Sequence, residues 1–150
     1  MEVYRIVSKK WSSKLTASGN AARWNTKENK VIYTAESRAL ACLENLVHTS
    51  GEELKKEFAI MLIEIPAALK IDRVEIASLP HNWFEFENLL ICRSIGDKWL
   101  MKKSSAVLRV PSVIISHEFN YLINPEHPDF KKIKLNSIED FRFDPRIITN

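Results

Sequence analysis

Glycine is scarce in this sequence of 150 residues, which contains only three: Gly19, Gly51 and Gly96. No two of them lie close enough to form a GxGxxG motif or a P-loop. Both loops depend on glycine because their backbone must approach phosphate groups without intervening side chains. If this protein binds a nucleotide, it therefore does not hold it in the way that Rossmann or P-loop proteins do.

Cysteine and long apolar runs are also in short supply. Cys42 and Cys92 lie far apart and form neither a CxxC pair nor a Cys/His ligand pattern, which excludes a disulfide framework. The longest apolar run, 58–63, is far shorter than the roughly 20 residues that a membrane-spanning helix needs. The amino terminus has an acidic residue at position 2 and lacks the apolar core of a signal peptide. We therefore expect a cytoplasmic protein with no membrane contact.

The charge is weakly positive, with a formal net charge of +3. This value suits an anionic small ligand or an acidic partner, and it does not predict nucleic-acid binding by this chain. The apolar fraction of 45% and the charged fraction of 27% are those of an ordinary globular protein. A chain of this length can bury a sufficient core in one domain, which we place over residues 1–150.

The hydrophobic pattern predicts an α+β fold, a single compact domain with a twisted mixed sheet and few helices. A near-continuous apolar run over Phe58–Ile65 is typical of a strand buried on both faces. Pro111 interrupts a later strand and predicts an edge or a bulge there, and this edge offers a surface for a homodimer. The predicted strands cover Val3–Val7, Val31–Tyr33, Phe58–Ile65, Arg73–Ala77, Ala106–Ile115, Ile133–Leu135 and Phe141–Phe143, and Pro125 and Pro128 predict a turn after Tyr121–Asn124. The predicted helices cover Thr34–Thr49 and Asn88–Ile95, with Gly96 as the C-cap of the second.

Glu44 has an unusual position on the first predicted helix. The apolar residues Leu40, Leu43, Leu46 and Val47 recur with the helical period and form one stripe. At about 100° per residue, Glu44 falls roughly 60° from the centre of this stripe, at the edge of the face meant for burial. A carboxylate is costly to bury without a partner. The position therefore predicts an acid at a cleft, or else a structural ion pair with an arginine.

Arg23 and Tyr33 precede this helix, in a polar loop and at the end of a short strand. The guanidinium of Arg23 offers a planar fork of donors that matches a diphosphate or a carboxylate. The ring of Tyr33 can pack in the core with its hydroxyl at the rim. Each residue alone has an ordinary interpretation, a surface salt bridge for Arg23 and a core position for Tyr33. Together with Glu44 they predict a cleft that contains an acid, an arginine and a tyrosine.

Ser112 lies in an apolar strand, where a hydroxyl is more often satisfied within the fold than functional. No histidine and acid flank it in the spacing of a nucleophile elbow, so the sequence does not predict a serine hydrolase. His48 lies one helical turn beyond Glu44, but a third ligand at metal-binding spacing is missing, and we predict no metal site. His117 and His127 lie in loops, where they could act on a substrate or cap turns.

Four segments of the sequence resemble the RES-domain family, and together they cover nearly the whole chain. They are Gly96-Asp-Lys-Trp-Leu100, Leu108-Arg-Val-Pro-Ser112-Val-Ile-Ile, Asn120-Tyr-Leu-Ile-Asn124-Pro-Glu-His127-Pro-Asp-Phe130 and Phe141-Arg-Phe-Asp144-Pro-Arg146. The family is named for an arginine, a glutamate and a serine. The matching positions here are Arg23, Glu44 and Ser112, and Tyr33 matches the family's active-site tyrosine.

This resemblance implies the toxin half of a bacterial toxin–antitoxin pair, with a fold that resembles ADP-ribosyltransferases and an Xre-like antitoxin as its partner. It implies that the toxin depletes NAD, which is a substrate and not a cofactor, by cleaving the bond between nicotinamide and ribose. Glu44 would then stabilise the transition state at the ribose, and Arg23 would hold the diphosphate. Tyr33 would stack on the nicotinamide ring, and Ser112 would position it through its amide.

Several alternatives stay open at this point. The acceptor of the ADP-ribose group can be water, phosphate or a protein side chain. Asn124 and His127 are candidates for the floor of the pocket without a catalytic role. Two other functional classes are an RNA-cleaving toxin that uses Glu44, Arg23 and a histidine, and a catalytically silent binding module whose cleft residues form a structural ion pair.

Overall fold

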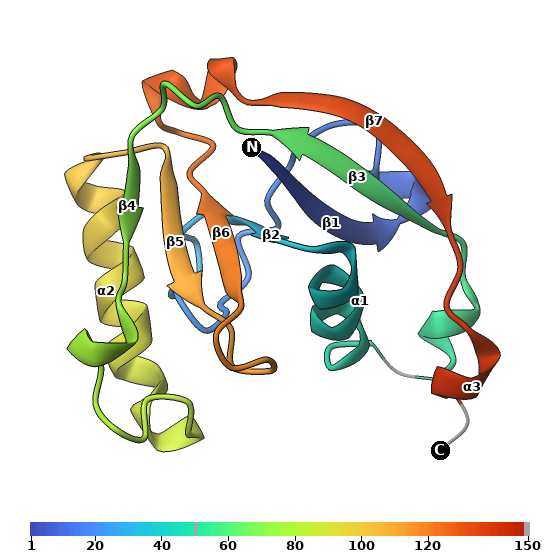
Figure 1. The fold of residues 1–150 in the computed structure, drawn as a ribbon, viewed down its shortest axis with the longest axis horizontal. Helices are drawn as coiled ribbons and strands as arrows, with labels where there is room; N and C mark the ends of the chain where they lie inside the picture. Colours follow the sequence, from blue (N-terminus) through green and yellow to red (C-terminus); the bar gives the residue numbers. More distant parts are fainter. Residues whose placement is uncertain (50, 149–150) are drawn as a thin grey trace.

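Seven strands form one mixed sheet in the computed structural model, which describes residues 1–49 and 51–148 (Figure 1). Their order across the sheet is β4-β5-β6-β2-β1-β3-β7; β4 and β5 are parallel, and the other neighbouring pairs are antiparallel. The strands are β1 Glu2–Ser8, β2 Ile32–Ala35, β3 Phe58–Glu64, β4 Ile71–Arg73, β5 Val107–Pro111, β6 Phe119–Ile123 and β7 Lys134–Phe141. The α-helices of the described residues are α1 Arg38–Leu46, α2 Leu89–Lys102 and α3 Pro145–Ile148. The predicted α+β class, with a mixed sheet and few helices, is confirmed.

The sheet has a seam between β2 and β1, where a single residue pair, Tyr4 with Ala35, joins the two strands. In Figure 1, β4, β5, β6 and β2 form one group of strands and β1, β3 and β7 form another, and the two groups fan apart. α1 lies below this seam and contacts both β1 and β2. A side chain on α1 can therefore reach the place where the two groups of strands diverge.

Each long helix has its own apolar core. α1 buries Leu40 against a cluster that includes Ile6 and Ile60. α2 buries Trp99 in a second cluster that includes Leu122 of β6. The two helices are thus fixed to different halves of the sheet, and each can place a part of one site.

β3 lies between β1 and β7, and its residues 58–63 are all buried, which confirms the predicted strand buried on both faces. Its neighbour β7 differs from the prediction of two short strands over Ile133–Leu135 and Phe141–Phe143. One continuous strand follows β3, with a register shift opposite Leu62 and Ile63. The middle of β7 is exposed and mostly polar, so the apolar pattern that marked its two ends is absent between them.

The predicted helix over Thr34–Thr49 is shorter at both ends. Its first two residues extend β2, because this strand pairs with β6 as far as Ala35. Ser37 then caps α1, since its Oγ accepts a hydrogen bond from the backbone N–H of Leu40 at 3.0 Å. At the other end Val47 is 59% exposed, so it does not belong to the buried stripe.

Three further boundaries differ from the sequence-based expectation. Gly96 does not end a helix, because α2 continues to Lys102 and stops where Lys103 adopts a left-handed conformation with φ of 48°. The strand expected over Arg73–Ala77 is not formed as such. β4 comes earlier in the chain and ends at Arg73, after a short pairing with β5, and a 3-10 turn over Ile76–Ser78 follows it. The strand expected over Ala106–Ile115 ends at Pro111, and β5 is not an edge strand, because it lies between β4 and β6; only its last residues, beyond the pairing with β4, have β6 as their single neighbour in the described sheet.

The two cysteines, Cys42 and Cys92, are free thiols in the structure. Burial raises the pKa of both thiols above its ordinary value, so both stay protonated at neutral pH. Among the described residues, no helix has the length and apolar character required to cross a membrane.

Candidate active site

Two anchor points fix α1 at the seam and thereby fix the position of Glu44. At the start of the helix, the backbone N–H of Glu36 donates to the carbonyl of Phe119 at 3.1 Å, and the N–H of Phe119 donates to Oε1 of Glu36 at 3.0 Å. Near the end, Nδ2 of Asn45 donates to the carbonyl of Ile6 at 3.0 Å. Because β6 holds one end of the helix and β1 holds the other, α1 cannot turn about its axis without breaking these bonds.

The Glu44 carboxylate accepts hydrogen bonds from two neutral donors. Its Oε1 is 2.5 Å from Nδ2 of Asn120 in β6 and 3.1 Å from Oγ of Ser112, which directly follows β5. Among the described residues, no lysine or arginine forms an ion pair with Glu44. The structural ion pair that the sequence left open is therefore not formed within the described residues.

Ser112 is buried and held in place by the backbone around it. Its Oγ accepts hydrogen bonds from the N–H groups of Ile114 at 3.0 Å and Ile115 at 3.2 Å, and its own N–H donates to the carbonyl of Glu118 at 2.9 Å. A hydroxyl has a single proton to donate. That proton is directed at Glu44, so Ser112 orients the carboxylate, and its expected contact with nicotinamide stays a prediction.

α2 holds the loop that carries Arg23. On one side of Arg23, Nε of Arg93 donates to the carbonyl of Ala22 at 2.8 Å. On the other side, the Asp97 carboxylate accepts hydrogen bonds from the N–H of Thr26 at 3.1 Å and from its Oγ1 at 2.8 Å. Because Arg93 and Asp97 lie one turn apart on the same face of α2, a single helix surface ties both flanks of the loop.

Gly96 lies on that same face and allows the loop to touch the helix. A Cβ atom at this position would lie 1.7 Å from the carbonyl oxygen of Trp24 and 3.2 Å from its Cβ. No side chain fits at such a distance, so Gly96 permits a close approach between backbones. This contact explains why a glycine that the sequence suggested as a helix end lies in the middle of α2.

Arg23 itself is half-buried, and its Nη1 donates to the backbone carbonyl of Trp83 at 3.3 Å. No ion pair between Arg23 and a carboxylate occurs in the described part of the chain. The surface salt bridge that would have been its ordinary role is thus not seen. The same guanidinium also interacts with the buried thiol of Cys92. Because a guanidinium has five N–H donors in a planar fork, further donors remain for an anionic ligand.

Tyr33 connects the Arg23 loop to the sheet. Its hydroxyl donates to Oδ1 of Asn25 at 2.7 Å and accepts from the N–H of Trp24 at 3.1 Å, while Nδ2 of Asn25 donates to three backbone carbonyls of the same loop. Burial raises the pKa of Tyr33 well above its usual value, and the charge of Glu44 makes a smaller contribution in the same direction. Tyr33 therefore stays neutral, and it lies within electrostatic range of the carboxylate. Its expected stacking on nicotinamide stays a prediction.

A pocket of about 380 Å³ opens beside Ser112. Trp83, whose carbonyl accepts the Arg23 hydrogen bond, forms another part of its wall. Of the four predicted site residues, only Ser112 belongs to the pocket lining. Glu44 is linked to the lining by its hydrogen bond with Ser112 and Arg23 by its hydrogen bond with Trp83, whereas Tyr33 has no such link in the described residues. The pocket volume lies in the range of about 300–1,000 Å³ that is usual for small-molecule sites. Its lining residues are Ile76, His81, Trp83, Phe84, Ser112, Val113, Ser116 and His117.

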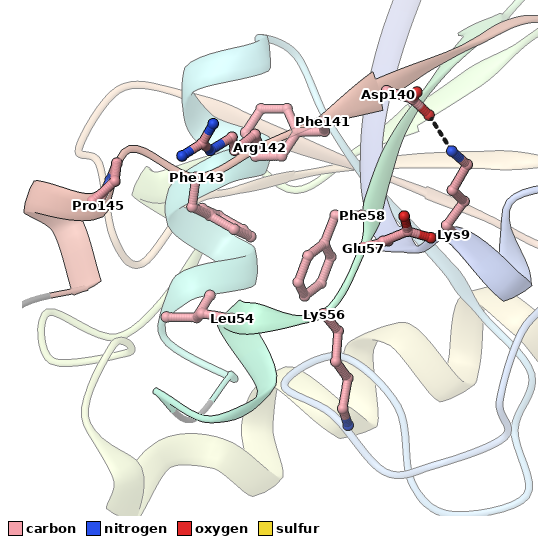
Figure 2. Close-up of a pocket in the computed structure, with 10 residues that line it drawn as sticks. All are labelled: Lys9, Leu54, Lys56, Glu57, Phe58, Asp140, Phe141, Arg142, Phe143 and Pro145. Carbon is pink, nitrogen blue, oxygen red and sulfur yellow. Dashed lines mark ion pairs between the residues drawn. The ribbon is translucent and has the colours of Figure 1, made fainter.

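A second hollow, of about 480 Å³, lies at the carboxyl end of β7 and the start of β3 (Figure 2). The rings of Phe58 and Phe143 meet edge to face there, with centroids 5.1 Å apart, and Lys9 pairs with Asp140 at 2.7 Å. None of the four predicted site residues lines this hollow. We therefore assign the candidate active site to the pocket beside Ser112.

Of the remaining sequence candidates, His117 lines the pocket, whereas Asn124, His127 and His48 lie outside it. Oδ1 of Asn124 accepts the N–H of Glu126 at 2.9 Å, and Nε2 of His127 is 3.1 Å from the carbonyl of Lys103. Both residues stabilise the turn after β6, and neither lines the pocket. His48 is exposed just beyond α1. In the described ranges, no group of three or more histidine, cysteine or acidic side chains is arranged to hold a metal ion.

Three residues of the site were missed by sequence reasoning: Asn120, Arg93 and Asp97. Asn120 did carry a signal, because it is a polar residue in the otherwise apolar strand Phe119–Ile123. Arg93 and Asp97 carried none, since charged residues on a helix are ordinary surface positions until the partner loop is known.

The sequence model of the RES domain matches residues 2–144 of this chain. The chain belongs to the RES-domain family. It is 39% identical over 129 residues to the "Prs ADP-ribosylating toxin" of Sphingobium sp. (strain YBL2), which covers 84% of this chain and 80% of that protein. It is 37% identical over 153 residues to "Toxin Res" of Yersinia enterocolitica, which covers 98% of this chain and 99% of that protein. The predicted family membership is confirmed.

A solved structure supports the fold of this RES-domain chain. A chain in the crystal structure of the M. tuberculosis MbcT–MbcA toxin–antitoxin complex superposes with a TM-score of 0.74, covering 98% of this chain and 86% of that one. The two sequences are only 15% identical, so this likeness concerns the fold alone.

The contact between Gly96 and the Arg23 loop makes a specific prediction. Gly96→Ala should destabilise the RES domain by about 1–3 kcal/mol, because the added methyl group must push the Trp24 carbonyl away. Thermal unfolding measures this loss. Gly51→Ala is the matched control, since a Cβ there meets open space, and its melting temperature should stay at the parent value. Equal melting temperatures for the two variants would show that the loop does not depend on Gly96.

Proposed function

We propose that this RES-domain chain is a toxin that consumes NAD by cleaving the bond between nicotinamide and ribose, and so arrests growth. The observation that carries the proposal is the Glu44 carboxylate, fixed by two neutral donors next to a pocket of suitable size. The name of the Sphingobium relative, an ADP-ribosylating toxin, supports the same chemistry, because ADP-ribosyl transfer also begins with release of nicotinamide.

The reaction needs a fixed negative charge more than it needs an acid. When the bond breaks, its electron pair moves to the ring nitrogen, and nicotinamide leaves as a neutral molecule. The positive charge stays on the ribose, shared between C1′ and the ring oxygen. A fixed carboxylate stabilises this oxocarbenium-like state through the ribose hydroxyls and its own charge. Because the leaving group requires no proton, one well-placed carboxylate can serve where O-glycosidases use two.

The neutral surroundings of Glu44 fit this role. A lysine or arginine on the carboxylate would cancel the charge that has to stabilise the cationic ribose. Ser112 and Asn120 fix the orientation of the carboxylate and leave its charge in place. We assign Glu44 as the catalytic residue, and we assign Arg23 to the diphosphate, which its planar fork can bind in a bidentate manner.

The acceptor then determines which product forms. Its lone pair bonds to C1′, and its proton is released to solvent. Water gives ADP-ribose, phosphate gives a phosphorylated ADP-ribose, and a protein side chain gives an ADP-ribosylated protein. The name of the Sphingobium relative, an ADP-ribosylating toxin of Prs, favours Prs as the acceptor, and Prs can be supplied in the assay.

The proposal includes an Xre-like antitoxin that blocks the pocket. A chain of the same fold occurs in a solved toxin–antitoxin complex, which supports a protein partner of this kind. The guanidinium of Arg23 pairs with no carboxylate among the described residues, so a carboxylate of the antitoxin can occupy the place intended for the diphosphate.

The first test incubates the purified, antitoxin-free protein with NAD and measures nicotinamide release by chromatography. Glu44→Gln should reduce the rate by about a hundredfold, because it removes the charge and keeps the shape, and it should melt at the parent temperature. Glu57→Gln, in the hollow of Figure 2, is the matched control and should keep the parent rate.

Three outcomes of that assay would contradict the proposal. Intact NAD after long incubation with the folded parent would refute NAD cleavage. An unfolded Glu44→Gln variant would make Glu44 a structural residue. RNA cleaved in a parallel incubation while NAD stays intact would support an RNA-cleaving toxin, in which His81 or His117 of the pocket wall could take part.

Arg23→Lys tests the diphosphate site. A lysine keeps the charge but cannot reproduce the planar fork, so kcat/KM for NAD should fall by about tenfold or more. Arg142→Lys is the control, since Arg142 is exposed beside the other hollow, and its kcat/KM should match that of the parent. If the two variants have the same kcat/KM, Arg23 has no role in binding NAD.

Co-expression with the neighbouring gene product tests the antitoxin. We expect the two proteins to co-purify and the complex to leave NAD intact. Proteolytic removal of the antitoxin should restore turnover. A stable complex that consumes NAD at the rate of the free toxin would show that the partner does not block the pocket.

A further inference from the structure

We propose that Asn120 is a positioning residue of this site, which holds the Glu44 carboxylate in its working orientation at the cost of a buried, unpaired carbonyl of its own. This inference rests on the proposed function. Asn120 donates a hydrogen bond to Glu44, and it is not one of the residues that line the pocket. Its effect on catalysis would therefore pass through Glu44.

The backbone of Asn120 is fixed from both sides. In β6, Asn120 pairs with Val110 of β5 on one side and with Ala35 of β2 on the other. Its side chain is 9% exposed, and Nδ2 donates to Oε1 of Glu44 at 2.5 Å, shorter than the 3.1 Å bond from Ser112. A donor on a central strand, with little freedom to move, is well suited to hold another side chain in place.

The other end of the Asn120 side chain has no partner. Its Oδ1 is buried, and within the described residues it accepts no hydrogen bond. A buried carbonyl without a donor destabilises the folded state, and native proteins contain few such groups. The following residues of β6, Tyr121, Leu122 and Ile123, are all buried, so an apolar residue would suit this strand better. The amide is therefore explained by its Nδ2 contact with Glu44 and not by packing.

Asn120 and Ser112 act together on one oxygen of Glu44. Both hydrogen bonds end on Oε1, and in the described part of the chain Oε2 accepts none. Two donors from two different segments, one just after β5 and one within β6, fix the plane of the carboxylate, whereas one donor would let it rotate about the single bond. Oε2 is then available for a ribose hydroxyl, while neither donor reduces the charge.

The test compares Asn120→Leu with the parent and repeats the substitution in the Glu44→Gln background, measuring kcat and KM for NAD. Leucine keeps the size of the side chain but removes the donor and the unpaired carbonyl. We expect kcat to fall by about tenfold or more, with KM within about twofold of the parent. In the Glu44→Gln background, Asn120→Leu should cause no further loss, because two residues that act as a unit are not additive.

Thermal unfolding gives a second readout that does not depend on activity. The melting temperature of Asn120→Leu should equal or exceed that of the parent, since the buried unpaired carbonyl is gone while Oε1 of Glu44 keeps its hydrogen bond from Ser112. Asn124→Leu is the matched control: Asn124 is also buried, just after β6, but its Oδ1 accepts the N–H of Glu126. That variant should melt at a lower temperature and keep the parent kcat.

The inference is overturned if kcat of Asn120→Leu matches the parent, or if kcat falls by the same factor in both backgrounds. A melting temperature below that of the parent overturns the claim of a destabilising carbonyl. Asn120→Ala takes the place of the leucine variant in the same cycle if the latter does not fold. If the parent itself leaves NAD intact, the proposed function fails, and the melting temperatures still decide whether the unpaired carbonyl destabilises the fold.

Discussion

The two hydrogen bonds that meet at Oε1 of Glu44 join the three elements on which the site depends. One donor follows β5, the other lies within β6, and the acceptor lies on α1. Removal of either donor would leave a half-buried carboxylate less well oriented beside the pocket. The anchors of α1 serve the same contact, because Glu36 ties the start of the helix to β6 and Asn45 ties its end to β1.

The second constraint is the close contact between α2 and the Arg23 loop. Gly96 lets the Trp24 carbonyl lie against the helix, and Asp97 binds the loop just beyond it. Tyr33 fastens the same loop to β2 through Trp24 and Asn25. α1 thus positions the Glu44 carboxylate, and α2 positions the Arg23 guanidinium by holding its loop. Each helix packs on its own half of the sheet. This division explains how residues far apart in the sequence can serve one pocket.

The sequence predicted those features that depend on local pattern. The position of Glu44 at the edge of an apolar stripe predicted a carboxylate at the border of the buried face, and the structure places it there, half-buried; the apolar run of β3 predicted the burial of this strand. Gly96 was misinterpreted because its partner, the carbonyl of Trp24, lies some seventy positions earlier in the chain, and no local pattern reveals such a contact. Asn120 was missed for a similar reason, since the pairing of β6 with β5 and β2 decides which side chains face α1. The family resemblance identified Ser112, although its hydrogen bond to Glu44 was visible only in the structure.

The central claim is that Glu44 and Arg23 form the two ends of one NAD site. The most direct measurement is a crystal structure of the Glu44→Gln variant soaked with NAD, which should be too slow to consume its ligand. In that crystal structure, a ribose hydroxyl should lie within hydrogen-bond distance of residue 44. The diphosphate should contact the guanidinium of Arg23, and the nicotinamide should lie in the pocket beside Ser112. NAD bound in the hollow between Phe58 and Phe143, or with its diphosphate away from Arg23, would contradict it.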